Sequence, residues 1–459
     1  MGYSPRIMDD LQARLSAVAE AEDHETLWER LTPLWPLATT DPQVAGVWAE
    51  ALRTSPGRAE LEDEARELLR VFPADPVLVG ATCDALIRRA ARTPFDEPPS
   101  GPGPGALAAE AAGRCLAKLS TSERSDPDLG GALHALEGNA LRTLGPLRLD
   151  DAAKALERAI ALEARVSWLF DLGLVHKVAR AWPEAVEVNR RARDLMETPH
   201  RGVLFNLAIA ATALGDGQAA AEAWRAAGIE ATCEADALPF VPGVPPAQVR
   251  LPTLGSGHAP SGEGELPDQA ASFEAVWVQP LSPCHGVVRS PTHREAIADF
   301  GDVVLWDPAP VAVVERDGEP VPRFPLLGVL KPGDERRLRF LAMQQSAGQI
   351  DAIAASMPSG VVLYAHGERV EVVCPRCAAG DVLVKHEHQP AEEHRIVFGK
   401  LVVPGSADLA AFAETLEQAR KSEPGVLMAI PELYEALGET AKAGQHHKRW
   451  GVIERTQGR

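Results

Sequence analysis

The pattern of apolar positions changes character along the chain. Up to about residue 230, apolar residues recur at helical spacing, as at 151–162, where Ala152, Leu156 and Ala159 would share one face of a helix. Past Phe273 the spacing alternates in short runs rich in valine, which is typical of half-buried β-strands. These runs lie at 274–278, 302–306, 311–315, 361–364, 370–373 and 395–403. The pattern predicts a helical first half followed by an α+β domain.

Turn and capping residues refine the second half. The Asp317-Gly318 pair between two apolar runs predicts a two-residue hairpin, and His366-Gly367 is expected to form another turn between strands. Helices should interrupt the strands, because amphipathic stretches follow residues that favour a first turn. They are expected over 335–345, 409–421 and 432–443, begun by Asp334, Asp408 and Pro431.

The helical half contains a pattern that is written twice, about 35 residues apart. Leu172-Gly173 is echoed by Leu207-Ala208, Ala185 by Ala220, and Ala192 by Ala227. Small residues at such positions let paired helices approach closely, and units of this length stack because none can bury its apolar face alone. Three units are expected, at 132–164, 166–199 and 201–230, with degenerate ones at 7–90. An irregular helical bundle is the alternative, since alanine-rich helices imitate repeats.

This pattern resembles the tetratricopeptide-repeat (TPR) family, which has Leu-Gly in the first helix of each unit and alanines in the second. The resemblance implies a helical solenoid that binds a protein or peptide in its groove. The chain departs from the family where His176 and Ala211 stand at the usual aromatic position, and where Asn189 stands at a position for a large residue.

Two stretches rich in proline and glycine punctuate the chain. Residues 93–105 are expected to form a long loop, because helical periodicity is present on both sides. Residues 242–268 hold almost no apolar residues and are expected to be a mobile linker. The expected domains are therefore a helical-repeat domain at 1–241 and an α+β domain at 269–459.

Composition limits the function. The chain has 459 residues, with 65 Asp and Glu against 46 Lys and Arg, and its net charge of −19 opposes nucleic acid and anionic membranes. It contains no apolar run long enough to cross a membrane and no export signal. Its six cysteines are too sparse for a disulfide scaffold. These features predict a cytoplasmic protein without nucleic-acid or membrane partners.

The strongest candidate for chemistry is a possible metal site near the C-terminus. Cys374 and Cys377 flank a tight turn, and His386 and His388 would lie on one face of a strand, giving the spacing C-x2-C-x8-H-x-H. Four such donors suit zinc in a structural site, with no position left for water. A redox role of the two cysteines would need a following helix to lower a thiol pKa, and the sequence predicts none.

The same segment supports a second set of ligands. Gly380, His386, His388, Glu392 and Gly399 fit the first motif of the cupin barrels, and the segment resembles that family over about twenty residues. The resemblance implies a catalytic iron, manganese or zinc ion held by the two histidines and the glutamate. The family's second histidine motif is missing. A third possibility is an exposed polar strand without any metal.

The sequence assigns no catalytic residue and does not identify the residues that bind a partner. Ser282, Cys284 and His285 are close in the chain, but neighbouring side chains on an extended strand point apart. Asp299-Phe300-Gly301 matches a kinase tripeptide by chance, because the other kinase motifs are missing. We therefore expect an interaction or scaffold protein that binds a partner protein or peptide, with a structural zinc site. The alternative is a metal-dependent hydrolase or oxygenase whose solenoid recruits the substrate.

Overall fold

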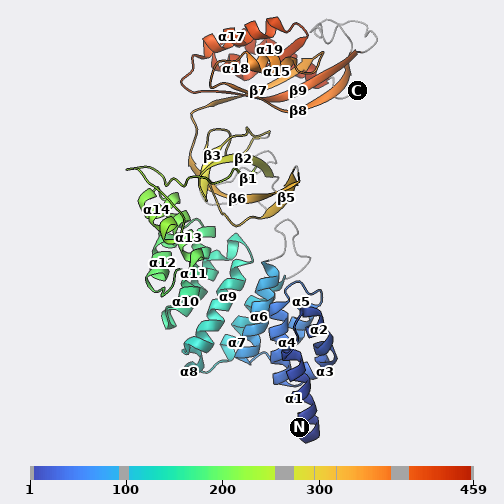
Figure 1. Cartoon of the computed structure of the whole chain (residues 1–459), viewed down its shortest axis with the longest axis vertical. Helices are drawn as coiled ribbons and strands as arrows, with labels where there is room; N and C mark the ends of the chain where they lie inside the picture. Colours follow the sequence, from blue (N-terminus) through green and yellow to red (C-terminus); the bar gives the residue numbers. More distant parts are fainter. Residues whose placement is uncertain are drawn as a thin grey trace. The chain divides into compact units, whose positions relative to one another are not determined.

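In the computed structural model, the described residues are 5–91, 103–253, 273–293, 295–316, 318–373 and 392–455. They form two compact units, of which the first runs to Val241 and the second begins at Pro242. The first unit is helical, and the second combines strands with helices (Figure 1). The expected order of a helical region followed by an α+β region is confirmed.

Most helices of the first unit follow one another after short turns, whereas residues 92–102, most of which belong to the predicted long loop, lie outside the described residues. Several begin at an aspartate followed by proline: the carboxylate of Asp41 accepts hydrogen bonds from the amides of Gln43 and Val44, and Asp75 does the same for its helix. The elements are α1 (Pro5–Ala19), α2 (His24–Leu31), η1 (Thr32–Leu34), α3 (Trp35–Ala38), α4 (Pro42–Thr54), α5 (Leu61–Val71), α6 (Pro76–Ala90), α7 (Pro104–Lys118), α8 (Thr121–Arg124), η2 (Pro127–Gly131), α9 (Ala132–Arg142), η3 (Pro146–Arg148), α10 (Leu149–Leu162), α11 (Val166–Val178), α12 (Trp182–Asp194), α13 (Arg201–Ala213) and α14 (Gly217–Ala226).

Three helix pairs occupy the ranges of the expected units: α9 with α10, α11 with α12, and α13 with α14. The repeated positions face the interior, since Ala185 and Ala220 are fully buried. A Cβ atom on Gly173 would lie 2.6 Å from the side chain of Asn189. The small residue therefore makes room for Asn189, the residue at which the sequence departs from the TPR pattern.

Two apolar clusters of described residues make up much of the core of the first unit, and α9 contributes to both of them. Leu133 and Ala140 belong to the cluster formed with α1 to α7. Ala135 and Leu141 belong to the cluster formed with α10 to α13. The helix is thus packed on two sides, which fixes its position between α7 and α10.

The second unit begins with a closed sheet. Among the described residues, its strand order is β1-β2-β3-β4-β6, β1 also pairs with β6, and β5 pairs with β6 outside this ring. All pairs are antiparallel except β1 with β6, and Val249, Val276 and Trp306 lie in the core of the barrel. The strands are β1 (Ala247–Pro252), β2 (Phe273–Ser282), β3 (His285–Val288), β4 (Val303–Trp306), β5 (Ala312–Arg316) and β6 (Glu319–Lys331).

Strand β1 lies within 242–268, which the sequence predicts to be a mobile linker. The prediction is wrong for residues 247–252, because Ala247, Val249 and Leu251 are buried and pair with β2. Only three apolar residues alternate here, among prolines and polar residues, so the strand signal is short. Residues 254–268 lie outside the described part of the chain.

A second sheet has the strand order β10-β7-β9-β8 among the described residues, with every pair antiparallel. Its core includes Phe340, Leu401, Phe412 and Leu433, which come from the sheet and from the helices packed on it. The elements are β7 (Arg336–Gln344), α15 (Gln349–Ala355), β8 (Val362–Val373), β9 (Glu392–Val403), α17 (Leu409–Ser422), β10 (Val426–Ala429), α18 (Pro431–Ala436) and α19 (Thr440–Arg455).

The helix predicted over 335–345 is wrong, because this segment is strand β7. Phe340 and Ala342 pack in one apolar cluster, whereas Leu341 and Met343 pack in another. A strand buried on both faces is a continuous apolar run, which period alone does not distinguish from a helix.

Two other local predictions need correction. His366-Gly367 is not a turn but lies inside β8, where the register with β9 shifts between Ala365 and Gly367. The helix predicted over 432–443 is two helices, α18 and α19, separated near Gly438, whose φ is +72°. The capping signal is confirmed, because Asp408 caps α17, and Gly318, with φ +80°, lies in the turn between β5 and β6.

Candidate functional site

The residues predicted to bind a metal cannot be placed. Cys374, Cys377, His386 and His388 lie outside the described residues, and Glu392 is described only as the first backbone position of β9. Within the described ranges, no group of three or more His, Cys, Asp or Glu side chains is arranged to hold a metal ion. Both ligand sets stay predictions.

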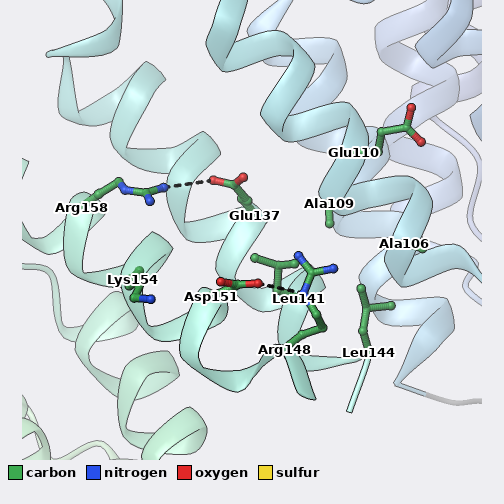
Figure 2. A pocket seen from close by; sticks show the side chains of 10 residues that line it. All are labelled: Ala106, Ala109, Glu110, Glu137, Leu141, Leu144, Arg148, Asp151, Lys154 and Arg158. Atoms are coloured by element: carbon green, nitrogen blue, oxygen red, sulfur yellow. Dashed lines mark hydrogen bonds and ion pairs between the residues drawn. The ribbon is translucent and has the colours of Figure 1, made fainter. Parts of the chain in front are cut away.

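The site that the structure does define is a cavity of about 480 Å³ in the first unit. It lies between α7 and α10, and α9 forms its floor (Figure 2). Its lining residues are Ala106, Ala109 and Glu110 of α7, Glu137 and Leu141 of α9, Leu144, Arg148 of η3, and Asp151, Lys154 and Arg158 of α10.

The cavity exists because α7 and α10 both approach α9 closely at small residues. A Cβ atom on Gly138 would lie 2.7 Å from Leu156 of α10, and one on Gly105 would lie 2.0 Å from Thr143, just after α9. Between these contacts, α7 presents only Ala106 and Ala109 to the cavity. Methyl groups are too short to fill the space between the two outer helices, so it stays open.

The α10 side of the cavity carries most of its positive charge. The guanidinium of Arg148 donates to Asp151 at 2.9 Å, whereas Arg158 lies 3.9 Å from the carboxylate of Glu137 (Figure 2). Lys154 is exposed and has no ion-pair partner among the described residues. On the α7 side, Glu110 pairs with Arg114 at 2.9 Å, outside the cavity lining.

An exposed leucine stands next to the cavity. Leu147 is 95% exposed and lies in η3, between the lining residues Leu144 and Arg148. The turn that presents it begins at Gly145, whose φ of +91° favours glycine. A single exposed apolar side chain is common on protein surfaces, but next to a cavity it adds apolar area that a bound molecule could cover.

No family model matches this chain, and no curated protein matches it. Across the residues that the structure describes, no helix has the length and apolar character to span a membrane. The candidate site therefore rests on its geometry alone.

A second hollow, of about 520 Å³, lies near the N-terminus but is less suited to a ligand. Trp28 donates its indole N–H to the Ser55 hydroxyl at 3.0 Å, and the guanidinium of Arg58 lies 4.0 Å from the centroid of the Trp28 ring. Arg58 also donates two hydrogen bonds to Glu64. These polar groups satisfy one another, which leaves few of them to recognise a bound molecule.

The Ser282 hydroxyl contacts both the Cys284 and the His285 side chains, which the sequence did not predict. The Ser282 hydroxyl lies 2.6 Å from Nδ1 of His285 and 3.5 Å from Sγ of Cys284, because the register of β2 with β3 shifts at this point. All three residues are fully buried, and burial lowers the pKa of His285 to about 4. A substrate has no access to these three buried side chains, so their contacts are structural.

The Asp299-Phe300-Gly301 segment matches a kinase tripeptide only by chance, but it has a structural role in this fold. Lys400 of β9 donates to Asp299 at 2.5 Å and to the Thr292 hydroxyl at 2.8 Å, and Arg337 of β7 donates to Asp302 at 2.5 Å. These ion pairs fasten the loop between β3 and β4 to the second sheet. Sequence alone gives no sign of them, since the partners are far apart in the chain.

Proposed function

We propose that this chain is a protein-interaction protein. Its helical region would be a TPR-like solenoid, and the cavity between α7 and α10 would bind a segment of a partner protein. One observation carries the proposal: an open cavity whose lining includes Ala106, Ala109 and Leu141 borders a leucine that is 95% exposed. Burying that leucine and the floor against a partner would remove apolar surface from water.

The lining residues favour binding over catalysis. None of the ten side chains around the cavity is a hydroxyl, thiol or imidazole group. Of the groups that take part in nucleophilic or acid–base catalysis, the lining holds only Lys154 and three carboxylates, and the carboxylates of Asp151 and Glu137 lie beside arginines. The cavity instead combines methyl groups with charged side chains at its rim, as at many protein interfaces.

The helix pairs support the solenoid part of the proposal. They follow the spacing of the repeated sequence, and Ala185 and Ala220 are buried at equivalent places in successive pairs. Stacked pairs of this kind present long surfaces to partners. A cytoplasmic location, as the sequence predicts, belongs to the same proposal.

For the second unit we retain structural zinc bound by Cys374, Cys377, His386 and His388. Val373 and Glu392 are register partners in β8 and β9, so the segment with these residues starts and ends at adjacent points of one strand pair. A metal ion bound by residues from both ends of this segment would hold it in a closed loop. The cupin-like set with Glu392 is the competing proposal, and the two differ in whether the cysteines are needed.

The binding proposal can be tested by selecting peptides from a random library on the full-length protein. Selected peptides are then measured by fluorescence anisotropy against Ala109→Phe, which fills the cavity, and against Ala161→Phe. Ala161 is exposed on α10 and does not line the cavity, so it is a matched control. We expect the first variant to weaken binding at least about tenfold, which corresponds to 1.4 kcal/mol, and the second to leave it unchanged. Peptides that bind both variants like the parent would refute the proposal.

A further inference from the structure

The charges around the cavity are unevenly distributed. Residues of η3 and α10 contribute three cations, Arg148, Lys154 and Arg158, against one acid, Asp151. This wall is positive although the whole chain carries a net charge of −19. Since salt screens charges beyond about 10 Å, the field inside the cavity is set by this wall and not by distant acids.

Among the described residues, two of the three cations make no side-chain hydrogen bond that a ligand would have to break, although Arg158 forms a long ion pair with Glu137. Arg148 is already hydrogen-bonded to Asp151, but Arg158 is 57% exposed and its distance of 3.9 Å from Glu137 is too long for a hydrogen bond. Lys154 has no ion-pair partner among the described residues. Lys154 and Arg158 are four residues apart on α10, so they lie on the same face, one turn from each other.

We propose that the segment bound in this cavity is acidic and amphipathic, with a carboxylate against Lys154 and Arg158 and an apolar side chain on the floor. This inference rests on the proposed function and identifies the chemistry of the partner. Ala106, Ala109 and Leu141 would receive the apolar side chain, and Leu147 would cover a second one at the rim.

The acids of the cavity set the orientation of the bound segment. Glu110 on α7 and Glu137 on the floor would repel a carboxylate, so the acidic side of the segment must face α10. They also argue against nucleic acid, whose phosphates would meet both glutamates. A cationic side chain of the segment would be repelled by Lys154 and Arg158 on the α10 side, so it would have to face Glu110 and Glu137 instead.

The test uses the same random peptide selection, followed by a double charge reversal, Lys154→Glu with Arg158→Glu. Arg66→Glu with Arg225→Glu is the matched control, because these residues are exposed on α5 and α14 and the net charge changes equally. We expect selected peptides to combine Asp or Glu with Leu or Phe. Their binding should weaken about tenfold or more in the first variant, stay unchanged in the second, and decrease as salt is raised.

The outcomes separate this inference from the proposed function. If selected peptides are blocked by Ala109→Phe but show no enrichment of acids and tolerate the charge reversal, the cavity binds partners but the acidic partner is refuted. If the selected peptides are basic and bind the Arg66→Glu, Arg225→Glu control more weakly than the parent, the charge argument is also overturned. If no peptide is sensitive to Ala109→Phe, both proposals fail together.

Discussion

Replacing Gly138 by alanine is a quantitative test of how α9 and α10 are packed. An added Cβ would lie 2.7 Å from Cγ of Leu156 and 2.9 Å from the carbonyl oxygen of Ala152. The leucine can rotate, but the carbonyl belongs to the backbone of α10, so the helices must separate. Overpacking of this kind typically costs about 1–3 kcal/mol.

The intrinsic preference of the helix for alanine acts in the opposite direction. Alanine stabilises a helix interior by about 0.5–1 kcal/mol relative to glycine. The cost of overpacking and this gain in helix stability must therefore be measured separately. Gly46→Ala is the control, because Gly46 lies inside α4 and nothing stands within 4 Å of its added Cβ. Relative to this control, Gly138→Ala should be less stable by about 1–3 kcal/mol.

The assay is urea unfolding followed by helical circular dichroism, combined with hydrogen exchange of peptides from α9 and α10. We expect Gly46→Ala to raise the midpoint slightly and Gly138→Ala to lower it relative to that variant, with faster exchange confined to the α9–α10 pair. If Gly138→Ala stabilises the protein as much as Gly46→Ala does, α9 and α10 are not packed at this contact, and the walls of the cavity are misplaced.

Three further predictions concern the second unit. Because the pKa of His285 is lowered to about 4 by burial, the unfolded chain takes up its proton at higher pH than the folded one, so stability should be fully present above about pH 6.5 and decrease towards pH 4. The loss for this one residue is about 3 kcal/mol, and a flat profile between these pH values, compared with His285→Gln, would contradict it. Lys400→Met leaves the partly buried Asp299 without its cation and should cost about 3–5 kcal/mol in urea unfolding. Adding Asp299→Asn should recover part of the loss, because the amide removes the charge but keeps an acceptor for the backbone amides of Thr292 and Phe300; equal stability of both variants and the parent would show that the pair is unimportant. Finally, in protein purified without chelators, Cys374→Ser should abolish stoichiometric zinc while Glu392→Gln retains it. The reverse result would favour the cupin-like set of ligands. A parent protein that contains no metal and is not stabilised by added zinc, iron or manganese would reject both sets.

Helical periodicity was enough to predict that the first unit is helical and where its last three helix pairs lie, because most of these helices bury one face. Asp408 likewise marks the start of α17, since a capping carboxylate is a local signal that does not depend on distant residues. Strand β7 shows where this reasoning fails. Phe340 and Leu341 are neighbours that are both buried, on opposite faces of the sheet, and no local pattern separates that case from a helix.

The candidate site was less predictable than the fold. Its lining residues come from three helices, and the width of the space between α7 and α10 depends on tertiary contacts such as Gly138 with Leu156. Lys154 and Leu147 look like ordinary surface residues in the sequence. The available signal was weak: two alanines spaced by three in α7, and two cations spaced by four in α10. Such pairs are common on exposed helices without any function.

The most direct test of the central claim is hydrogen exchange of the full-length protein with and without a saturating selected peptide. The account predicts that the bound peptide slows exchange in the segments around 106–110, 137–148 and 151–158, which hold the lining residues and Leu147. Exchange in the second unit should not change. Protection confined to other helices, or no protection anywhere at saturation, would contradict the claim that this cavity binds a partner.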